Sequence, residues 1–436
     1  MHHRSTESPP AFRAVSAFRH PALASTMRRS GGAGGGRSRG ERKGWGNGGR
    51  PLRALLRICD RARRSDLAMR YIGNKTRLLP FILSALRRLG IRPGTAHDAF
   101  AGTAAVGRAL KAEGWRVASS DLMSYSHVFQ QAYVVAQGVG PLRDLARREP
   151  GVARAIRAWP RDDARSPREN ALRAVAHYLA TERAPEQGFV TEHFSPAGGR
   201  MYFTEQNAAR IDAARRSLHE WRTRQWIDEP TCCILLAALL EGADRVANTA
   251  GVYAAYIKSW QGNATRPLSM DPQLPVKGAR GSTAHRTDAA TLASALGPID
   301  LLYIDPPYNA RQYPGYYHVP ELIARGWFDG PVTLRGKTGL LPADGQRSAW
   351  CSPRRVKGAL SELLAATNAQ HVLVSYNSEG LLPDTDLRAV LAEASVDGKV
   401  RRFSKGYRRY RADSEHAARR YKGSVVRELL YHARLR

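Results

Sequence analysis

Hydrophobic positions recur at a helical spacing early in the patterned part of the chain. Gly73 and Gly90 bound the first such segment, at 75–89, in which the apolar positions are Leu78, Leu79, Ile82, Leu83 and Leu86. Intervals of three and four residues predict an amphipathic helix. A second helix is predicted at 106–113, where Gly114 ends the pattern.

Short apolar runs that end in turns predict strands between the helices. They lie at 95–100, 115–120, 301–304, 371–375 and 425–431. Runs of this length suit strands that are covered on both faces of a sheet. Strands that alternate with helices predict an α/β fold with a mostly parallel sheet and right-handed crossovers.

Residues from about 125 to 265 interrupt this alternation. They are rich in Ala and Arg, and their pattern is mostly helical. The stretch is too long for a single crossover connection, so we interpret it as an inserted helical subdomain. The α/β domain then consists of an N-terminal part at 69–124 and a C-terminal part at 266–436.

The first 68 residues differ in composition from the rest. They contain GGAGGGRSRG (31–40) and carry 15 Lys and Arg against four Asp and Glu. A basic Gly/Arg-rich segment without an apolar face is predicted to be disordered. Three interpretations remain open: a tail that binds nucleic acid, an organellar transit peptide, or a mis-assigned start, because Met69 stands directly before the first patterned segment.

Charge and cysteine content narrow the class of protein. Lys and Arg number 68 and Asp and Glu 38, so the formal net charge of +30 favours nucleic acid as a partner. Four cysteines without a CxxC pair argue against a disulfide scaffold and a zinc site, and we expect no metal. The longest apolar run is too short to span a bilayer, so we expect a cytoplasmic protein with no membrane partner.

The sequence DAFAGTAAVG (98–107) follows the first predicted strand. Gly102 lets the backbone approach a ligand closely, and Gly107 allows tight helix packing. The turn lacks the three-glycine spacing of a dinucleotide fingerprint and therefore has no cradle for a pyrophosphate. Such a turn suits an adenosyl ligand without phosphates. Asp121 ends the next strand, about 20 residues on, where an acid can hold ribose hydroxyls. The structural alternatives are an ordinary turn before a helix and a helix cap at Asp121.

The most specific motif is DPPY at 305–308, directly after an apolar strand. Two prolines make a rigid turn at the sheet edge where open α/β folds bind ligands. The carboxylate of Asp305 and the carbonyl of Pro306 can accept both protons of an exocyclic amine. Pro307 stiffens the turn, and Tyr308 offers a flat face on which a base can stack.

Together the motifs resemble those of the adenine-N6 DNA methyltransferases, in the order of the Dam-like alpha group. YIGNK (71–75), DAFAG and DPPY carry the resemblance, and NARQYPGYYHVPELIA (309–324), GKTG (336–339) and CSPRR (351–355) are similar to modification methylases of the FokI type. The resemblance covers most of 69–435, but 125–265 least securely and 1–68 not at all. It implies a Rossmann-like S-adenosylmethionine-dependent methyltransferase fold in a bacterial-type, nucleoid-associated enzyme.

The resemblance also implies methyl transfer from S-adenosylmethionine to N6 of an adenine extruded from double-stranded DNA, with a cognate restriction endonuclease as a further partner. Lys75 is expected to bind the methionine carboxylate and Asp121 the ribose. Asp288 either accepts from the cofactor's adenine or caps the helix that follows it. The full expected cofactor set is Tyr71, Gly73, Asn74, Lys75, Asp98, Phe100, Gly102, Thr103, Asp121 and Asp288.

DNA contacts are expected from the residues after DPPY and from KGYRRYR (405–411), which interleaves aromatics with Arg. Such a charge run is also typical of a solvated face. The principal expected contacts are Asn309, Arg311, Gln312, Tyr313, Tyr316, His318, Lys337, Lys405, Arg408, Arg409 and Arg411. Tyr317, which also follows DPPY, is a further expected contact.

Two other functions remain open from the sequence alone. One is methyl transfer to a different sp2 nitrogen, in RNA or in a protein glutamine, although such enzymes usually carry Asn where Asp305 stands. The other is a catalytically silent DNA-binding protein, against which the intact DPPY argues.

Overall fold

A seven-stranded sheet forms the centre of the protein. The computed structural model describes residues 69–343, 345–408 and 425–435. The strand order is β3-β2-β1-β4-β5-β7-β6. Neighbours from β3 to β5 pair in parallel, whereas β7 is antiparallel to both β5 and β6. The strands are β1 (Thr95–Asp98), β2 (Arg116–Asp121), β3 (Thr283–Arg286), β4 (Ile299–Ile304), β5 (Ala369–Asn377), β6 (Arg401–Arg408) and β7 (Val425–Arg434).

The two faces of this sheet are covered by different helices. On β4, Leu301 and Tyr303 join one apolar cluster and Leu302 and Ile304 the other, because successive side chains point to opposite faces. One face packs against α2 (Leu79–Arg88), which follows the turn η1 (Thr76–Leu78), and α3 (Ala105–Ala112). The other face packs against α11 (Ala289–Ala295), α14 (Val356–Ala366) and α15 (Asp384–Ala394).

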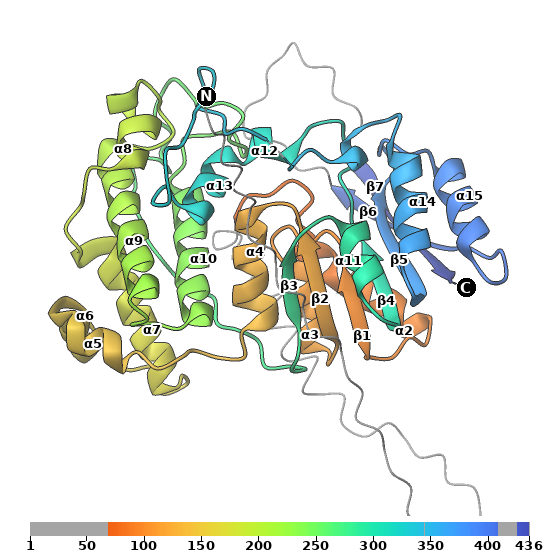
Figure 1. Cartoon of the computed structure of the whole chain (residues 1–436), viewed down its shortest axis with the longest axis horizontal. Coiled ribbons are helices and arrows are strands. Elements are labelled where there is room, and N and C mark those ends of the chain that lie inside the picture. The colour runs from red at the N-terminus through yellow and green to blue at the C-terminus, as the bar shows by residue number, and fades with distance from the viewer. Residues whose placement is uncertain (1–68, 344, 409–424, 436) are drawn as a thin grey trace, which may run out of the picture. The chain divides into compact units, whose positions relative to one another are not determined.

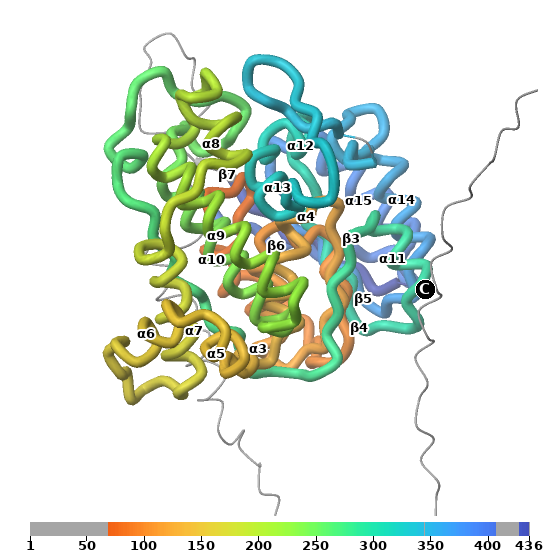
Figure 2. The backbone as a smooth tube through the Cα atoms, turned by 60° about the vertical axis from the view of Figure 1, so that its left-hand side comes forward, coloured from red at the N-terminus to blue at the C-terminus, as the bar shows by residue number. Residues whose placement is uncertain are grey.

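A group of helices lies beside the β3 edge of the sheet (Figure 1). Among them, α10 is apolar almost all round and has 14 buried residues, as expected for a helix inside a bundle. Figure 2 shows α9 and α10 side by side, and the two are in contact. The helices are α4 (Ser124–Gln130) with η2 (Gln131–Val135), α5 (Arg143–Arg148), α6 (Pro150–Ala158), α7 (Pro167–His177) with η3 (Tyr178–Glu182), α8 (Phe189–Phe194), η4 (Pro196–Gly198), α9 (Glu205–Thr223) and α10 (Glu229–Arg245).

These helices share a core with the sheet. One apolar cluster runs from Ile82 of α2 and Leu301 of β4 through Leu239 of α10. The expected insertion at 125–265 is thus helical from Ser124 to Arg245, while its boundaries as a separate subdomain stay an interpretation. The helices of the described ranges are all too short or too polar to cross a membrane.

Between β4 and β5 the chain passes through α12 (Tyr313–Tyr316), α13 (His318–Arg325), η5 (Ala349–Cys351) and then α14. The strand order reverses between β1 and β4, because β2 lies on one side of β1 and β4 on the other. Connections on either side of such a reversal leave a crevice at the carboxyl ends of the strands. The mostly parallel α/β fold predicted from the pattern is confirmed.

Candidate active site

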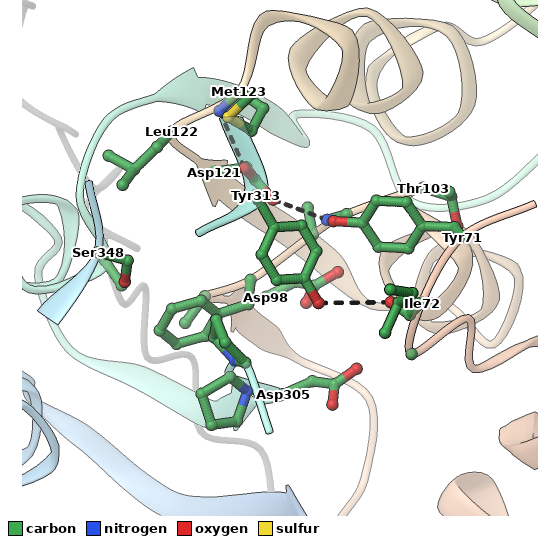
Figure 3. A pocket seen from close by; sticks show the side chains of 18 of the residues that line it. Tyr71, Ile72, Asp98, Thr103, Asp121, Leu122, Met123, Asp305, Tyr313 and Ser348 are labelled. Atoms are coloured by element: carbon green, nitrogen blue, oxygen red, sulfur yellow. Dashed lines mark hydrogen bonds between the residues drawn. The ribbon is translucent and has the colours of Figure 1, made fainter. Parts of the chain in front are cut away.

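A pocket occupies the crevice at the carboxyl ends of β1, β2 and β4 (Figure 3). Five chain segments meet there, at 71–75, 98–106, 121–123, 287–289 and 305–309, together with Gln312, Tyr313, Gln346 and Ser348. All ten residues expected to bind the cofactor and all four residues of DPPY line this pocket. Their assigned roles stay predictions, but the fold brings them to a single cavity.

Asp121 holds the turn between β1 and α3. Its Oδ2 accepts a hydrogen bond from the Gly102 amide at 2.9 Å, and its Oδ1 accepts from the Met123 amide at 2.9 Å. Gly102 has φ +52°, and a Cβ there would stand 2.9 Å from the Tyr71 ring. The glycine is therefore required both by the backbone conformation and by the close approach of Tyr71. Burial raises the pKa of Asp121, and the two amide bonds oppose that rise.

Asp98 presents an unpaired acceptor in the wall of the pocket. Its Oδ2 accepts from the Gly107 amide at 2.9 Å, while Oδ1 is buried without a hydrogen-bond partner among the described residues. Burial, with a further contribution from the charge of Asp305, raises the pKa of Asp98 to about 7. A buried acceptor without a partner is costly, so this oxygen suits a ligand that donates a hydrogen bond.

Asp288 caps α11, which is the second of the two roles predicted for it from the sequence. Its Oδ1 accepts from the amides of Ala290 at 2.8 Å and Thr291 at 3.4 Å. The residue also lines the pocket, so a contact with the cofactor stays a prediction beside the observed cap.

The DPPY motif is in contact with Lys75. Lys75 Nζ lies 2.9 Å from Oδ1 of Asp305 and 3.0 Å from the Gly73 carbonyl oxygen. The Tyr308 hydroxyl donates to the same Oδ1 at 2.6 Å, and Lys75 Nζ stands 4.7 Å from the centre of the Tyr308 ring. Burial raises the pKa of Asp305, whereas Lys75 and the Tyr308 hydroxyl lower it.

Four tyrosines fix the segment that carries Lys75. The ring of Tyr71 stacks on Tyr317 with centroids 4.9 Å apart and also contacts Tyr125 and Tyr313. The amide of Ile72 donates to the Tyr317 hydroxyl at 2.8 Å. Arg70 directly precedes this segment, and its Nε lies 3.2 Å from Oδ2 of Asp244 on α10. The ion pair and the tyrosine contacts together fix the segment at the wall of the pocket.

Burial removes three residues from the expected DNA contacts. Tyr316, Tyr317 and His318 expose 6%, 0% and 0% of their surface, because α12 and α13 turn them into the core. His318 Nε2 lies 2.9 Å from the Thr338 carbonyl oxygen. Their position in the sequence, directly after DPPY, predicts contact with DNA, whereas the structure buries their side chains.

Gln312 forms two hydrogen bonds with the backbone of Ser348. Its Nε2 donates to the Ser348 carbonyl at 3.0 Å, and its Oε1 accepts from the Ser348 amide at 2.8 Å. Its side chain therefore ties together two pocket segments rather than pointing freely at DNA. Trp350 follows and packs edge-on against Phe100, with centroids 4.9 Å apart. Neither Ser348 nor Trp350 was found from the sequence, since no motif marks them.

The remaining expected DNA contacts are placed as follows. Arg311, Lys337 and Lys405 are exposed, and Asn309 and Tyr313 are partly exposed at the pocket mouth, so contact with DNA stays a prediction for all five. Arg409, Arg411 and the side chain of Arg408 lie outside the described residues, as does the segment 1–68. Within the described ranges, no group of three or more His, Cys, Asp or Glu side chains is placed to hold a metal ion.

Comparison with known proteins agrees with the resemblance seen in the motifs. Type II methyltransferase M.NlaIII from Neisseria lactamica is 33% identical over 79% of this chain and 93% of its own. Type II methyltransferase M.FokI from Planomicrobium okeanokoites and modification methylase LlaI from Lactococcus lactis subsp. lactis are each 31% identical. Those matches cover 80% and 83% of this chain, which spans only 51% and 54% of the two relatives.

The family model of the D12 class N6 adenine-specific DNA methyltransferases matches residues 71–340. This range contains YIGNK, DAFAG and DPPY, and it includes every lining residue of the pocket except Gln346 and Ser348. The family predicted from the motifs is confirmed, and the chain belongs to the D12 class N6 adenine-specific DNA methyltransferases.

Proposed function

We propose that this enzyme transfers the methyl group of S-adenosylmethionine to N6 of an adenine extruded from double-stranded DNA, inside the pocket at the carboxyl ends of β1, β2 and β4. The observation that carries the proposal is the meeting of Asp305 and Tyr308 with Asp98, Gly102 and Asp121 in one cavity. The methyl donor and the acceptor base can therefore be held side by side.

The pocket residues fit S-adenosylmethionine. The unpaired Oδ1 of Asp98 can accept from the cofactor's amino group, and Lys75 can hold its carboxylate. Asp121 lies where it can accept from the ribose hydroxyls, and Phe100 forms an apolar wall. When bound, the cofactor supplies a methyl group that its sulfonium has already activated.

Asp305 and Pro306 are proposed to hold the target amine. Lys75 and Tyr308 both contact Oδ1 of Asp305, and no described residue forms a hydrogen bond with Oδ2, so that oxygen can accept from N6. A second bond to the Pro306 carbonyl favours a pyramidal nitrogen whose lone pair is free to attack. Positioning of this kind supplies roughly 7–11 kcal/mol of the barrier reduction.

Extrusion of the adenine costs a few kcal/mol, since its pairing and stacking in the duplex are lost. Stacking on the Tyr308 ring offsets part of that cost at about 1–3 kcal/mol per base. After transfer, the methylated nitrogen carries an extra proton, which the Asp305 carboxylate can accept.

The relatives are type II methyltransferases and modification methylases by name. We therefore include in the proposal that a cognate restriction endonuclease cleaves the same DNA site when it is unmethylated, and that the enzyme works at the nucleoid of a bacterial-type cytoplasm.

Expression of the full chain in a host without DNA methylation tests the proposal. Single-molecule sequencing is expected to map N6-methyladenine at one short recognition sequence, and the Asp305→Ala variant is expected to leave that sequence unmodified. Methylation of cytosine, or of RNA without DNA, would contradict the proposed substrate.

A further inference from the structure

Gln346 lines the pocket from the connection between α13 and η5, and the reaction described above gives it no role. Gln346 and Ser348 are the two lining residues outside the range 71–340 that the family model matches. The backbone of Ser348 is fixed by its two hydrogen bonds with the side chain of Gln312. This part of the connection therefore has a defined position at the pocket.

A buried carboxylate orients the side-chain amide of Gln346. Its Nε2 lies 2.7 Å from Oε1 of Glu321 on α13 and 3.5 Å from the carbonyl oxygen of Leu122. Glu321 exposes 1% of its surface, and its Oε2 accepts from the amides of Ser124 at 2.8 Å and Tyr125 at 3.3 Å. The Glu321 carboxylate is thus anchored at the start of α4 and bonded to Gln346 at the same time.

These contacts determine which end of the Gln346 amide is left for a ligand. A side-chain amide has a donor end and an acceptor end of nearly the same shape, so its partners decide its direction. The Leu122 carbonyl can only accept, and the Glu321 carboxylate accepts as well, so the NH2 end of Gln346 faces them. No described residue donates a hydrogen bond to Oε1 of Gln346. Gln346 therefore offers an oriented acceptor at the pocket.

The neighbours of this acceptor indicate its ligand. Leu122 directly follows Asp121, which is proposed to hold the ribose, and both residues line the pocket. The adenosine half of S-adenosylmethionine carries hydrogen-bond donors, namely the two ribose hydroxyls and the amino group of the adenine. An acceptor that cannot turn over favours a ligand with a donor at that point and disfavours one without it.

We infer that Gln346 is a further cofactor-binding residue, whose Oε1 accepts a hydrogen bond from a donor on the adenosine half of S-adenosylmethionine. The inference rests on the proposed function. It adds to the expected cofactor set a residue that lies outside the YIGNK, DAFAG and DPPY motifs.

Gln346→Met tests the inference because methionine has a similar length and no amide. Calorimetric titration of the full chain with S-adenosylhomocysteine, the product left after methyl transfer, measures binding without reaction. We expect the dissociation constant to rise about 2- to 10-fold, which corresponds to one neutral hydrogen bond.

Analogues of S-adenosylhomocysteine identify the donor. Each analogue lacks one group: the 2′-hydroxyl, the 3′-hydroxyl or the 6-amino group of the purine. Removal of the group that binds Gln346 should weaken binding to the wild type about 2- to 10-fold more than binding to Gln346→Met, because the variant has already lost that bond. Equal losses in the two proteins for all of the analogues would overturn the inference.

Gln312→Met is the matched control. Gln312 lines the same pocket, but both ends of its amide are bonded to the backbone of Ser348, at 3.0 and 2.8 Å. Its substitution disturbs the same connection without removing an acceptor left for a ligand. We therefore expect it to change the affinity for every analogue by one common factor. The same dependence on a single donor in Gln312→Met and Gln346→Met would contradict the inference, since a displaced pocket wall would then explain both.

Glu321→Gln tests the direction of the Gln346 amide. The new side chain keeps its oxygen toward the amides of Ser124 and Tyr125, so its NH2 end faces Gln346 and favours the turned-over amide, with the donor end at the pocket. S-adenosylhomocysteine should then bind at least as weakly as it does to Gln346→Met, and Gln346→Met added to Glu321→Gln should cause no further loss. Losses that simply add would show that Glu321 does not act through Gln346 and would contradict an oriented acceptor.

Binding of S-adenosylhomocysteine to the wild type separates the two proposals. If the wild type binds it but the analogues show no dependence on Gln346, only the role of Gln346 fails. If the wild type binds neither S-adenosylhomocysteine nor S-adenosylmethionine, the proposed function fails.

Discussion

Lys75 Nζ lies 2.9 Å from Oδ1 of Asp305, and the two side chains expose only 4% and 13% of their surface. This ion pair joins the segment 71–75, which forms one wall of the pocket, to the turn that follows β4. Replacing either residue leaves the other as an uncompensated buried charge, which is costly.

Lys75→Met is therefore expected to affect stability, cofactor binding and catalysis together. Removal of one partner of a buried pair costs about 3–5 kcal/mol where the other stays charged. Loss of the ammonium also raises the pKa of Asp305, so the acid limb of methylation should move to higher pH. Denaturant unfolding, calorimetric titration with S-adenosylmethionine and a pH–rate profile measure the three effects.

Lys357→Met is the control for this prediction. Lys357 and Asp386 form an ion pair of the same length, 2.9 Å, but expose 55% and 41% of their side chains. An exposed pair contributes about 0–1 kcal/mol, so this variant should resemble the wild type. Equal destabilisation in both variants would contradict the role given to burial.

Asp305→Ala is expected to abolish methyl transfer while cofactor binding persists. The Asp305 carboxylate is proposed to act on the target amine, whereas Lys75, Gly102 and Asp121 are proposed to hold the cofactor. Without Asp305, Lys75 is free to pair with the cofactor's carboxylate, so the dissociation constant of S-adenosylmethionine should stay equal or fall. A collapse of cofactor affinity with residual turnover would reverse the assignment of roles.

Asp121→Ala is expected to weaken cofactor binding, in contrast to Asp305→Ala. Asp121 accepts one hydrogen bond of 2.9 Å from the Gly102 amide of the turn after β1 and another of 2.9 Å from the Met123 amide, and both bonds are lost in the variant. Each is worth about 1 kcal/mol or more when it involves a charged acceptor, so cofactor affinity should fall at least about 10-fold. Equilibrium binding of S-adenosylmethionine checks this outcome before any rate is measured.

The central part of the fold could be predicted because buried strands carry continuous apolar runs. LLYI (301–304) lies inside β4, and the predicted strand at 371–375 lies inside β5. The strands β3 and β6 were not predicted. β3 (Thr283–Arg286) and β6 (Arg401–Arg408) are the two edges of the sheet and carry polar side chains, so neither has an apolar pattern.

The candidate site was predictable to the extent that its residues follow strands in the sequence. Asp98, Asp121 and Asp305 end or follow neighbouring strands, and parallel strands bring their carboxyl ends to one edge. Trp350 reaches the same region from a distant segment, and only the packed chain shows it there. Tyr317 was misread because the sequence alone does not separate a buried tyrosine from one that stacks on a base.

Tyr308→Phe and Tyr308→Ala are expected to differ both in rate and in pH profile. The phenylalanine keeps the stacking ring but loses the 2.6 Å hydrogen bond to Asp305, a bond that lowers the pKa of that carboxyl. The acid limb of the pH–rate profile of Tyr308→Phe should therefore move to higher pH, with a modest loss of rate. The alanine also loses about 1–3 kcal/mol of stacking, or roughly 10- to 100-fold in rate.

A DNA substrate with the target adenine in a mismatch separates the two contributions of Tyr308. A weakly paired base is cheaper to extrude, so the defect of Tyr308→Ala should shrink on that substrate, whereas the shifted limb of Tyr308→Phe should not change. A defect of Tyr308→Ala that is equal on both substrates would mean that the ring supports the turn rather than the extruded base.

Asp98 is expected to make the stability of the enzyme fall as the pH rises. Burial raises its pKa from the ordinary 3.8 to about 7, so between these values the folded state binds more protons than the unfolded state. The free energy of unfolding then decreases with increasing pH, by an amount on the order of 4 kcal/mol for this group. The loss begins above the unfolded pKa and is complete above about pH 7.

Asp98→Asn removes the titrating group and leaves an amide oxygen that can still accept from the Gly107 amide. We expect the variant to be the more stable protein at neutral and higher pH and to lose the part of the pH dependence that Asp98 causes. Glu241, whose pKa burial raises to about 8, acts in the same direction in both proteins, so it cancels in the difference between the two unfolding curves. Because a cationic ligand favours the ionised carboxylate, S-adenosylmethionine should bind the wild type more tightly as the pH rises through 7, and this dependence should be absent from Asp98→Asn. Parallel unfolding curves for the two proteins across that range would show that Asp98 is already ionised in the folded enzyme at acidic pH.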